Sequence, residues 1–142
     1  MLSSLSEALR ATERFIQHWP RGVALAFTGG YGIGKTHLIA QIYAAAWAQG
    51  LTAIYTTGPA LERLFLDFRT AAERDEGDIT PLQAWHDHIF ADILLLDEAD
   101  RQAQQNGNSW GERKGFDLID TRLSHNRSVV LAGNALEQRL HP

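Results

Sequence analysis

The chain has 142 residues, 44% of them hydrophobic and 21% charged, a composition typical of one soluble globular domain. It has no cysteine, which excludes disulfides, thiol catalysis and cysteine-ligated zinc and suits a reducing compartment. The net charge of −4 argues against a surface that binds nucleic acid everywhere, so any contact with DNA would be local. No apolar run approaches the roughly 18 residues of a membrane span and no signal-peptide pattern begins the chain, so we expect a cytoplasmic protein with no membrane partner.

The first predicted element is an amphipathic helix from Ser4 to His18. Its apolar residues recur on one face, which favours packing on the protein's own core over docking to a partner. Three arginines, Arg10, Arg14 and Arg21, are interpreted as a solvated face and not as a nucleic-acid patch.

A glycine-rich motif follows between a predicted strand, Val23 to Phe27, and a predicted helix, His37 to Trp47. The motif reads G-x-x-x-x-G-K-T, which is typical of a P-loop, where backbone N–H groups and a helix N-terminus meet a phosphate. Lys35 is expected to reach the β- and γ-phosphates, and the Thr36 hydroxyl to ligate Mg²⁺. The predicted phosphate-binding residues are Gly29, Gly30, Tyr31, Gly32, Ile33, Gly34, Lys35, Thr36 and His37.

The middle of the chain alternates strand and helix patterns. A strand is predicted from Leu51 to Thr57, a helix from Ala60 to about Arg74, and a further helix beginning at Pro81. His86 and His88 on that last helix are two residues apart, a spacing that points them in different directions. We interpret them as ordinary surface or interface histidines and not as a metal site.

The stretch from Asp92 to Asp100 contains an uninterrupted apolar run, Ile93 to Leu96, which is followed by two carboxylates, Asp97 and Glu98. Such a run predicts a strand covered by helices on both faces. Asp97 at its carboxyl end would hold Mg²⁺ through water as a Walker B aspartate does, and Glu98 would act as general base toward the attacking water. The alternative is an acidic helix N-terminus that follows a buried strand.

The last third of the chain begins with a polar stretch, Arg101 to Gly111, which predicts a loop. Trp110 within it is either an exposed anchor or folded back onto the domain. A helix from Glu112 to Asn126 and a strand from Ser128 to Ala132 follow. Asn134, just past this strand, could hydrogen-bond the γ-phosphate and the attacking water, or simply belong to a Gly-Asn turn.

Three segments together resemble the AAA+ ATPases of the helicase-loader type, the DnaC-like loaders and the IstB-like transposition helpers. They are GGYGIGKTHL from Gly29, ILLLD ending at Asp97, and IDTRLSHNRSVVLAGN ending at Asn134. The resemblance implies an α/β P-loop NTPase fold, a three-layer sandwich with a parallel sheet. It also implies ATP and Mg²⁺ as ligands, ATP hydrolysis, and contacts with a replicative helicase or transposase, with single-stranded DNA and with further copies of the chain.

The family continues beyond the position of Asn134 into an arginine-finger helix, a fifth strand and a helical lid. We therefore expect residues 1–142 to be a single AAA+ core without the lid, C-terminally truncated, with the P-loop strand at an open edge of the sheet. Arg122 matches the family's arginine on the preceding helix, and its contact, nucleotide or neighbour, is left open. Arg139 is too close to Asn134 to be assigned as the finger.

Two other functions remain open beside an ATPase that loads a helicase or assists transposition. A chain without lid and arginine finger could bind nucleotide and serve as an interaction module with little hydrolysis. A small P-loop kinase, in which a substrate hydroxyl replaces water, fits less well, because adjacent Asp97 and Glu98 at a strand end favour a hydrolase.

Overall fold

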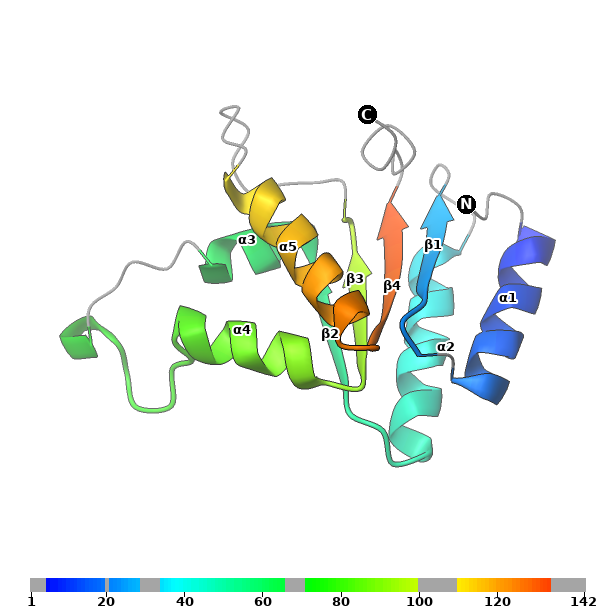
Figure 1. Ribbon diagram of the computed structural model, residues 1–142, viewed down its shortest axis with the longest axis horizontal. Coiled ribbons are helices and arrows are strands. Elements are labelled where there is room, and N and C mark those ends of the chain that lie inside the picture. The colour runs from blue at the N-terminus through cyan, green and yellow to red at the C-terminus, as the bar shows by residue number, and fades with distance from the viewer. Residues whose placement is uncertain (1–4, 20, 29–33, 66–70, 100–109, 134–142) are drawn as a thin grey trace.

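The protein alternates helices and strands throughout the computed structural model, which describes residues 5–19, 21–28, 34–65, 71–99 and 110–133 (Figure 1). The strands are β1 (Ala24–Thr28), β2 (Ala53–Thr57), β3 (Ile93–Asp97) and β4 (Ser128–Gly133). The helices are α1 (Leu5–His18), α2 (Lys35–Ala48), α3 (Gly58–Phe65), α4 (Pro81–Phe90) and α5 (Trp110–Ser124), with a short 3-10 helix at Ala71–Glu73. None of the helices in the described part of the chain is long and apolar enough to cross a membrane.

The four strands form one sheet in the order β1-β4-β3-β2, and all neighbouring pairs are parallel. Parallel strands need crossover connections, which here are the helices between them. All four carboxyl ends therefore meet at one edge of the sheet, the upper edge in Figure 1. The expected α/β class is confirmed, and β1, the strand before the P-loop, lies at an edge of the sheet formed by the described strands, as expected.

Helices cover both faces of the sheet and create two cores. On one face, α1 and α2 pack against alternate strand residues such as Phe27, Leu95 and Val130. On the other, α3, α4 and α5 pack against the residues between them, such as Leu94 and Leu131. All five residues of β3 are buried, as its uninterrupted apolar sequence predicted. The result is the expected three-layer sandwich, in which α1 packs on the protein's own core.

Most predicted elements are found within a few residues of their expected bounds. Thr80 and Gln83 form a capping box with Pro81 at the first turn of α4, which explains its sharp start. The expected single helix from Ala60 to Arg74 is wrong at its far end, where Ala71–Glu73 is a 3-10 helix. The expected loop to Gly111 is also too long, because α5 already begins at Trp110.

His88 differs from its predicted surface or interface position. It is buried, 7% exposed, and its Nδ1 lies 2.6 Å from the Ala84 carbonyl oxygen within α4. Burial lowers the pKa of His88 below its usual 6.5, because the charged imidazolium loses its hydration. His86, two residues earlier, is exposed as expected.

Arg122 on α5 is fully buried and stabilises the edge of the sheet opposite the carboxyl ends. Its guanidinium donates five hydrogen bonds of 2.6–3.2 Å to backbone oxygens. The accepting carbonyls belong to His88, Ile89, Ala91, Asp92 and Ser128, so one side chain joins the end of α4 to the start of β3 and β4. The open question about Arg122 is thereby answered within the described residues: its guanidinium binds the domain's own backbone at the amino edge.

Candidate nucleotide site

Those of the predicted nucleotide-binding residues that the structure describes lie at the carboxyl edge of the sheet. β1 ends at Thr28 and α2 begins at Lys35, so the glycine motif joins a strand end to a helix start as predicted. Asp97 ends β3, and β4, between β1 and β3, ends at Gly133. The predicted residues 29–33 and Asn134 lie outside the described residues, as does most of the polar stretch after Asp100.

The first turn of α2 is suited to an anion. Its N-cap residue, Gly34, has left-handed backbone angles of φ 75° and ψ 25°, and no side chain caps this end. No acidic residue lies in the first turn, so the positive end of the helix dipole is not balanced by a carboxylate from the same turn. Lys35 at the first helical position adds a fixed positive charge. This is the arrangement in which helix N-termini bind phosphate.

The structure brings Thr36 and Asp97 together although 61 positions separate them. The Thr36 hydroxyl donates a hydrogen bond of 2.9 Å to Asp97 Oδ2. Asp97 is 5% exposed and continues the alternation of Ile93 and Leu95, which pack on the α2 side of the sheet. The period of two in a strand therefore turns this carboxylate toward the helix that follows the glycine motif.

These two oxygens fit a magnesium ion. A hydroxyl that donates its proton to a carboxylate keeps its lone pairs, so Thr36 can ligate a cation while it remains bonded to Asp97. Mg²⁺ prefers oxygen ligands and is usually held by one or two protein groups together with water and substrate phosphates. Among the described residues, no cluster of three or more His, Asp or Glu side chains could hold a metal, so Thr36 and Asp97 would supply only part of the ion's ligands.

Tyr55 on β2 is a neighbour of Asp97 that sequence reasoning missed. Its hydroxyl donates a 3.0 Å hydrogen bond to Asp97 Oδ2, the same oxygen that Thr36 contacts. Burial, this hydrogen bond and the negative charges of Asp97 and Glu98 raise the pKa of Tyr55 to about 12. The sequence held one indication of this contact. Tyr55 lies two residues after Ala53 in the same strand, so both side chains lie on the α2 side of the sheet, where Asp97 also lies.

Glu98 follows with an unusual backbone. Its φ of 48° is left-handed, which is uncommon for a residue other than glycine, and its N–H donates to Asp97 Oδ1 at 2.9 Å. Leu96 pairs with Leu131, but the Ala99 N–H donates to the Ala132 carbonyl, so the register shifts by one residue at Glu98. Such a bulge re-aims side chains and is common beside active sites. The predicted alternative, a helix starting here, is not what residues 97–99 show.

Comparison with known proteins shows which fold this is. The sequence matches no protein-family model and no curated protein. The structure is similar to the DnaC helicase loader, with 23% identity and a TM-score of 0.62 over 91% of this chain and 69% of that one. It is also similar to DnaI, with 21% identity and a TM-score of 0.67 over 96% of this chain and 69% of that one. AMPPCP-bound DnaA from Aquifex aeolicus gives 19% identity and a TM-score of 0.72 over 96% of this chain.

These identities are low, and what they show is a common fold. The chain spans about 40% of the length of that DnaA structure. This chain therefore has the same α/β fold, with a parallel sheet between helices, as these DnaC, DnaI and DnaA structures.

Proposed function

We propose that residues 1–142 form one AAA+ core domain that binds ATP with Mg²⁺ at the carboxyl edge of its sheet and hydrolyses it to ADP and phosphate. The observation that carries the proposal is the 2.9 Å contact between Thr36 and Asp97, which joins the helix after the glycine motif to the acidic strand end. The uncapped start of α2 and the similarity to a DnaA structure that contains AMPPCP support it.

The proposed roles follow from the chemistry of each side chain. Residues 29–37 would surround the phosphates, with the Lys35 ammonium on the β- and γ-phosphates. Thr36 and Asp97 would hold Mg²⁺, which neutralises charge on the phosphate oxygens when bound. Glu98 would accept the proton of the attacking water, and Asn134 would orient that water. Tyr55 would position Asp97 through the shared oxygen.

The biological role we propose is that of a helicase loader or transposition helper, in which ATP switches contacts with a replicative helicase or a transposase. The fold shared with the DnaC helicase loader and with DnaI supports the helicase as the first partner to test. Assembly into a homo-oligomer belongs to the same proposal.

Calorimetric titration of ATP with Mg²⁺ tests the binding half of the proposal. Lys35→Ala should weaken binding by more than about tenfold, since it removes a charge held at the phosphates. Lys114→Ala is the matched control: it makes the same charge change on α5, where the ammonium lies 4.8 Å from the centre of the Trp85 ring. Equal affinities of the two variants would contradict a working P-loop.

Phosphate release tests the hydrolytic half. Glu98→Gln should keep ATP affinity within about threefold and lower turnover by roughly 10²–10⁴-fold, the usual contribution of a general base. Glu76→Gln, an exposed residue before α4, makes the same chemical change and should leave turnover unaltered. Normal turnover in Glu98→Gln would refute its assignment. Tight ATP binding without turnover in the wild type, even with helicase and single-stranded DNA, would favour the interaction module.

A further inference from the structure

The Asp97 carboxylate is held by three hydrogen bonds that come from three parts of the fold. The Thr36 hydroxyl on α2 and the Tyr55 hydroxyl on β2 both donate to Oδ2, at 2.9 and 3.0 Å. The Glu98 N–H, at the bulge after β3, donates to Oδ1 at 2.9 Å. Because Asp97 is buried, these neighbours and not bulk water set the orientation of its carboxylate.

The strand register explains why Tyr55 is the β2 residue that reaches Asp97. In the parallel pair of β2 and β3, Thr57 lies opposite Asp97. The Thr57 hydroxyl accepts a 3.1 Å hydrogen bond from the Ala60 N–H at the start of α3. Tyr55 lies two residues earlier, on the same face of β2, and its long side chain spans the diagonal to the neighbouring strand. The hydroxyl of Tyr55 is therefore the β2 group that contacts the carboxylate.

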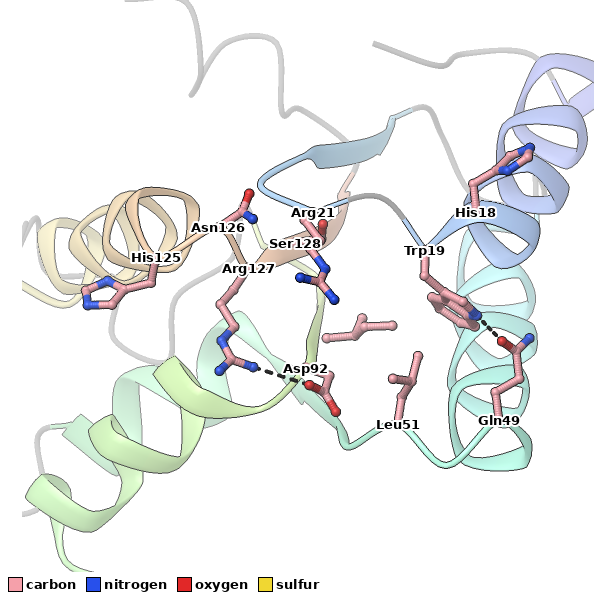
Figure 2. A pocket seen from close by; sticks show the side chains of 11 residues that line it. His18, Trp19, Arg21, Gln49, Leu51, Asp92, His125, Asn126, Arg127 and Ser128 are labelled. Carbon is pink, nitrogen blue, oxygen red and sulfur yellow. Dashed lines mark hydrogen bonds and ion pairs between the residues drawn. The ribbon is translucent and has the colours of Figure 1, made fainter.

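Asp92, directly before the amino end of β3, shows what is different about Asp97. It lines a hollow of about 590 Å³ at the amino edge of the sheet, where Figure 2 shows its carboxylate bonded to Arg127. The guanidinium, 3.2 Å away, neutralises that carboxylate. The three donors to Asp97 are neutral, two hydroxyls and one backbone N–H. They hold the Asp97 carboxylate without cancelling its charge, so Asp97 is the acid of β3 that suits a cation.

The same three bonds limit how Asp97 can meet a metal ion. An ionised carboxylate has about four lone-pair sites, two on each oxygen. Thr36 and Tyr55 fill both sites on Oδ2, and the Glu98 N–H fills one on Oδ1. With the donors of the described residues counted, one site is left, on Oδ1. Asp97 can then bond to a water or to an ion through one oxygen, but not through both.

Divalent ions differ in what they require of a carboxylate. Mg²⁺ is small, prefers an octahedral shell and gives up its water reluctantly, so a contact through one oxygen or through water suits it. Ca²⁺ is larger, takes about six to eight oxygen ligands and commonly uses both oxygens of a carboxylate. An Asp97 with Oδ2 filled meets the first requirement and not the second. The hydroxyl of Tyr55 is what completes the filling of Oδ2.

We propose that Tyr55 makes this site select Mg²⁺ over Ca²⁺, because its hydroxyl occupies the second lone-pair site of Asp97 Oδ2. Tyr55 acts through Asp97 and is therefore a positioning residue that determines metal specificity. The inference rests on the proposed site for ATP and Mg²⁺ and adds to it the choice of the metal. It requires no hydrolysis, so binding alone tests it.

The test is calorimetric titration of ATP into the full chain at saturating Mg²⁺ and, separately, at saturating Ca²⁺. The wild type should bind ATP at least about tenfold more tightly with Mg²⁺, roughly the effect of one hydrogen bond to a charged group. In Tyr55→Phe this ratio should fall below about threefold, since the freed site on Oδ2 lets Ca²⁺ use both carboxylate oxygens. An unchanged ratio in Tyr55→Phe, or no preference for Mg²⁺ in the wild type, would overturn the proposal.

A purely structural role of Tyr55 predicts a different result. If its hydroxyl only fastened the edge strand β2 to β3, Tyr55→Phe would weaken ATP binding equally with both ions and keep the wild-type ratio. The ratio compares two ions in one protein, so a general loss of stability cancels. Tyr43→Phe is the matched control: it removes the same hydroxyl from a tyrosine of α2 whose ring contacts Trp47, and it should keep the wild-type ratio.

A double-variant cycle tests whether Tyr55 acts through Asp97. In an Asp97→Asn background, Tyr55→Phe should change the ratio by less than about twofold, because the carboxylate that the hydroxyl controls is already absent. The same change in the ratio with and without the Asp97 carboxylate would overturn the proposal. Circular dichroism confirms that each variant is folded.

The outcomes separate this inference from the proposed function. Lys35→Ala should weaken ATP binding with both ions, because it removes a charge at the phosphates and leaves Asp97 unchanged. Failure of the wild type to bind ATP with either ion would contradict the ATP site and this inference together. Normal ATP binding with Mg²⁺ and a wild-type ratio in Tyr55→Phe would contradict the choice of the metal alone.

Discussion

The substitution Arg122→Met tests whether this buried arginine stabilises the fold, as its backbone hydrogen bonds indicate, or binds nucleotide. Methionine fills a similar length without charge, so the five backbone oxygens around the guanidinium lose their donors. The carbonyls of His88, Ile89 and Ala91 lie at the end of α4, where helical donors run out. The variant therefore uncouples α4 from the sheet at its amino edge.

The expected loss follows from the burial and the number of bonds. A hydrogen bond to a charged group contributes about 1.5–3 kcal/mol, but five on one guanidinium are not additive. Burial works against them, since desolvation lowers the pKa of Arg122 to about 10. Removing one partner of a buried charged network costs about 3–5 kcal/mol, which we take as the estimate. With about 2–4 °C per kcal/mol for a domain of this size, Tm should fall by roughly 6–20 °C.

Urea denaturation followed by circular dichroism measures this loss. The control is Arg127→Met, which removes one ion pair with Asp92 whose side chains are 33% and 39% exposed. Such a pair contributes about 0–1 kcal/mol, so the control should remain close to the wild type. Equal stabilities of the two variants would refute the reasoning. Weaker ATP binding by a fully stable Arg122→Met would also refute it, because Arg122 would then act at the nucleotide.

Three further predictions concern single residues. Tyr55→Phe should remove one tyrosine that ionises near pH 12, which an absorbance titration at 295 nm measures. In the wild type, the Tyr55 hydroxyl stabilises the fold below pH 10, and this contribution should be lost as the pH rises through 12. The pKa of His88 is lowered in the fold, so the unfolded chain binds the proton more tightly and the free energy of unfolding falls as the pH drops below 6.5. The melting temperature of His88→Gln should therefore fall less between pH 7.5 and pH 5 than the melting temperature of the wild type. Gly22→Ala should destabilise by about 1–2 kcal/mol in urea, since φ is 68° and a Cβ would lie 2.8 Å from Asn126 Oδ1; an unchanged midpoint would contradict this.

Local patterns were sufficient for most of the architecture. The apolar run of β3 predicted a strand buried on both faces, and the glycine motif predicted a strand-to-helix junction. Both depend on neighbours in the sequence, through side-chain period and backbone freedom, so no tertiary information was needed. The same reasoning placed Asp97 at a strand end, because the apolar run stops there.

The sequence predictions failed at positions where contacts in the folded domain, and not the local sequence pattern, decided the structure. His88 was expected at the surface or an interface, but it is one of the three buried residues of α4. The helix predicted from Ala60 to Arg74 was wrong at Ala71–Glu73, which form a 3-10 helix, because helical propensity is only a weak preference that tertiary context can override. The sequence could not decide whether the Trp110 side chain is exposed or folded back onto the domain, because the polar stretch before α5 has no hydrophobic periodicity.

The sequence by itself determined the alternation of strands and helices and which polar residues follow the strand ends, because both depend on residues adjacent along the chain. Only the tertiary structure decided which distant groups meet. Tyr55 reaches Asp97 because β2 and β3 are neighbours in register, and Arg122 reaches five carbonyls because α5 crosses the amino edge. Strand order and register are long-range properties, which no local period encodes.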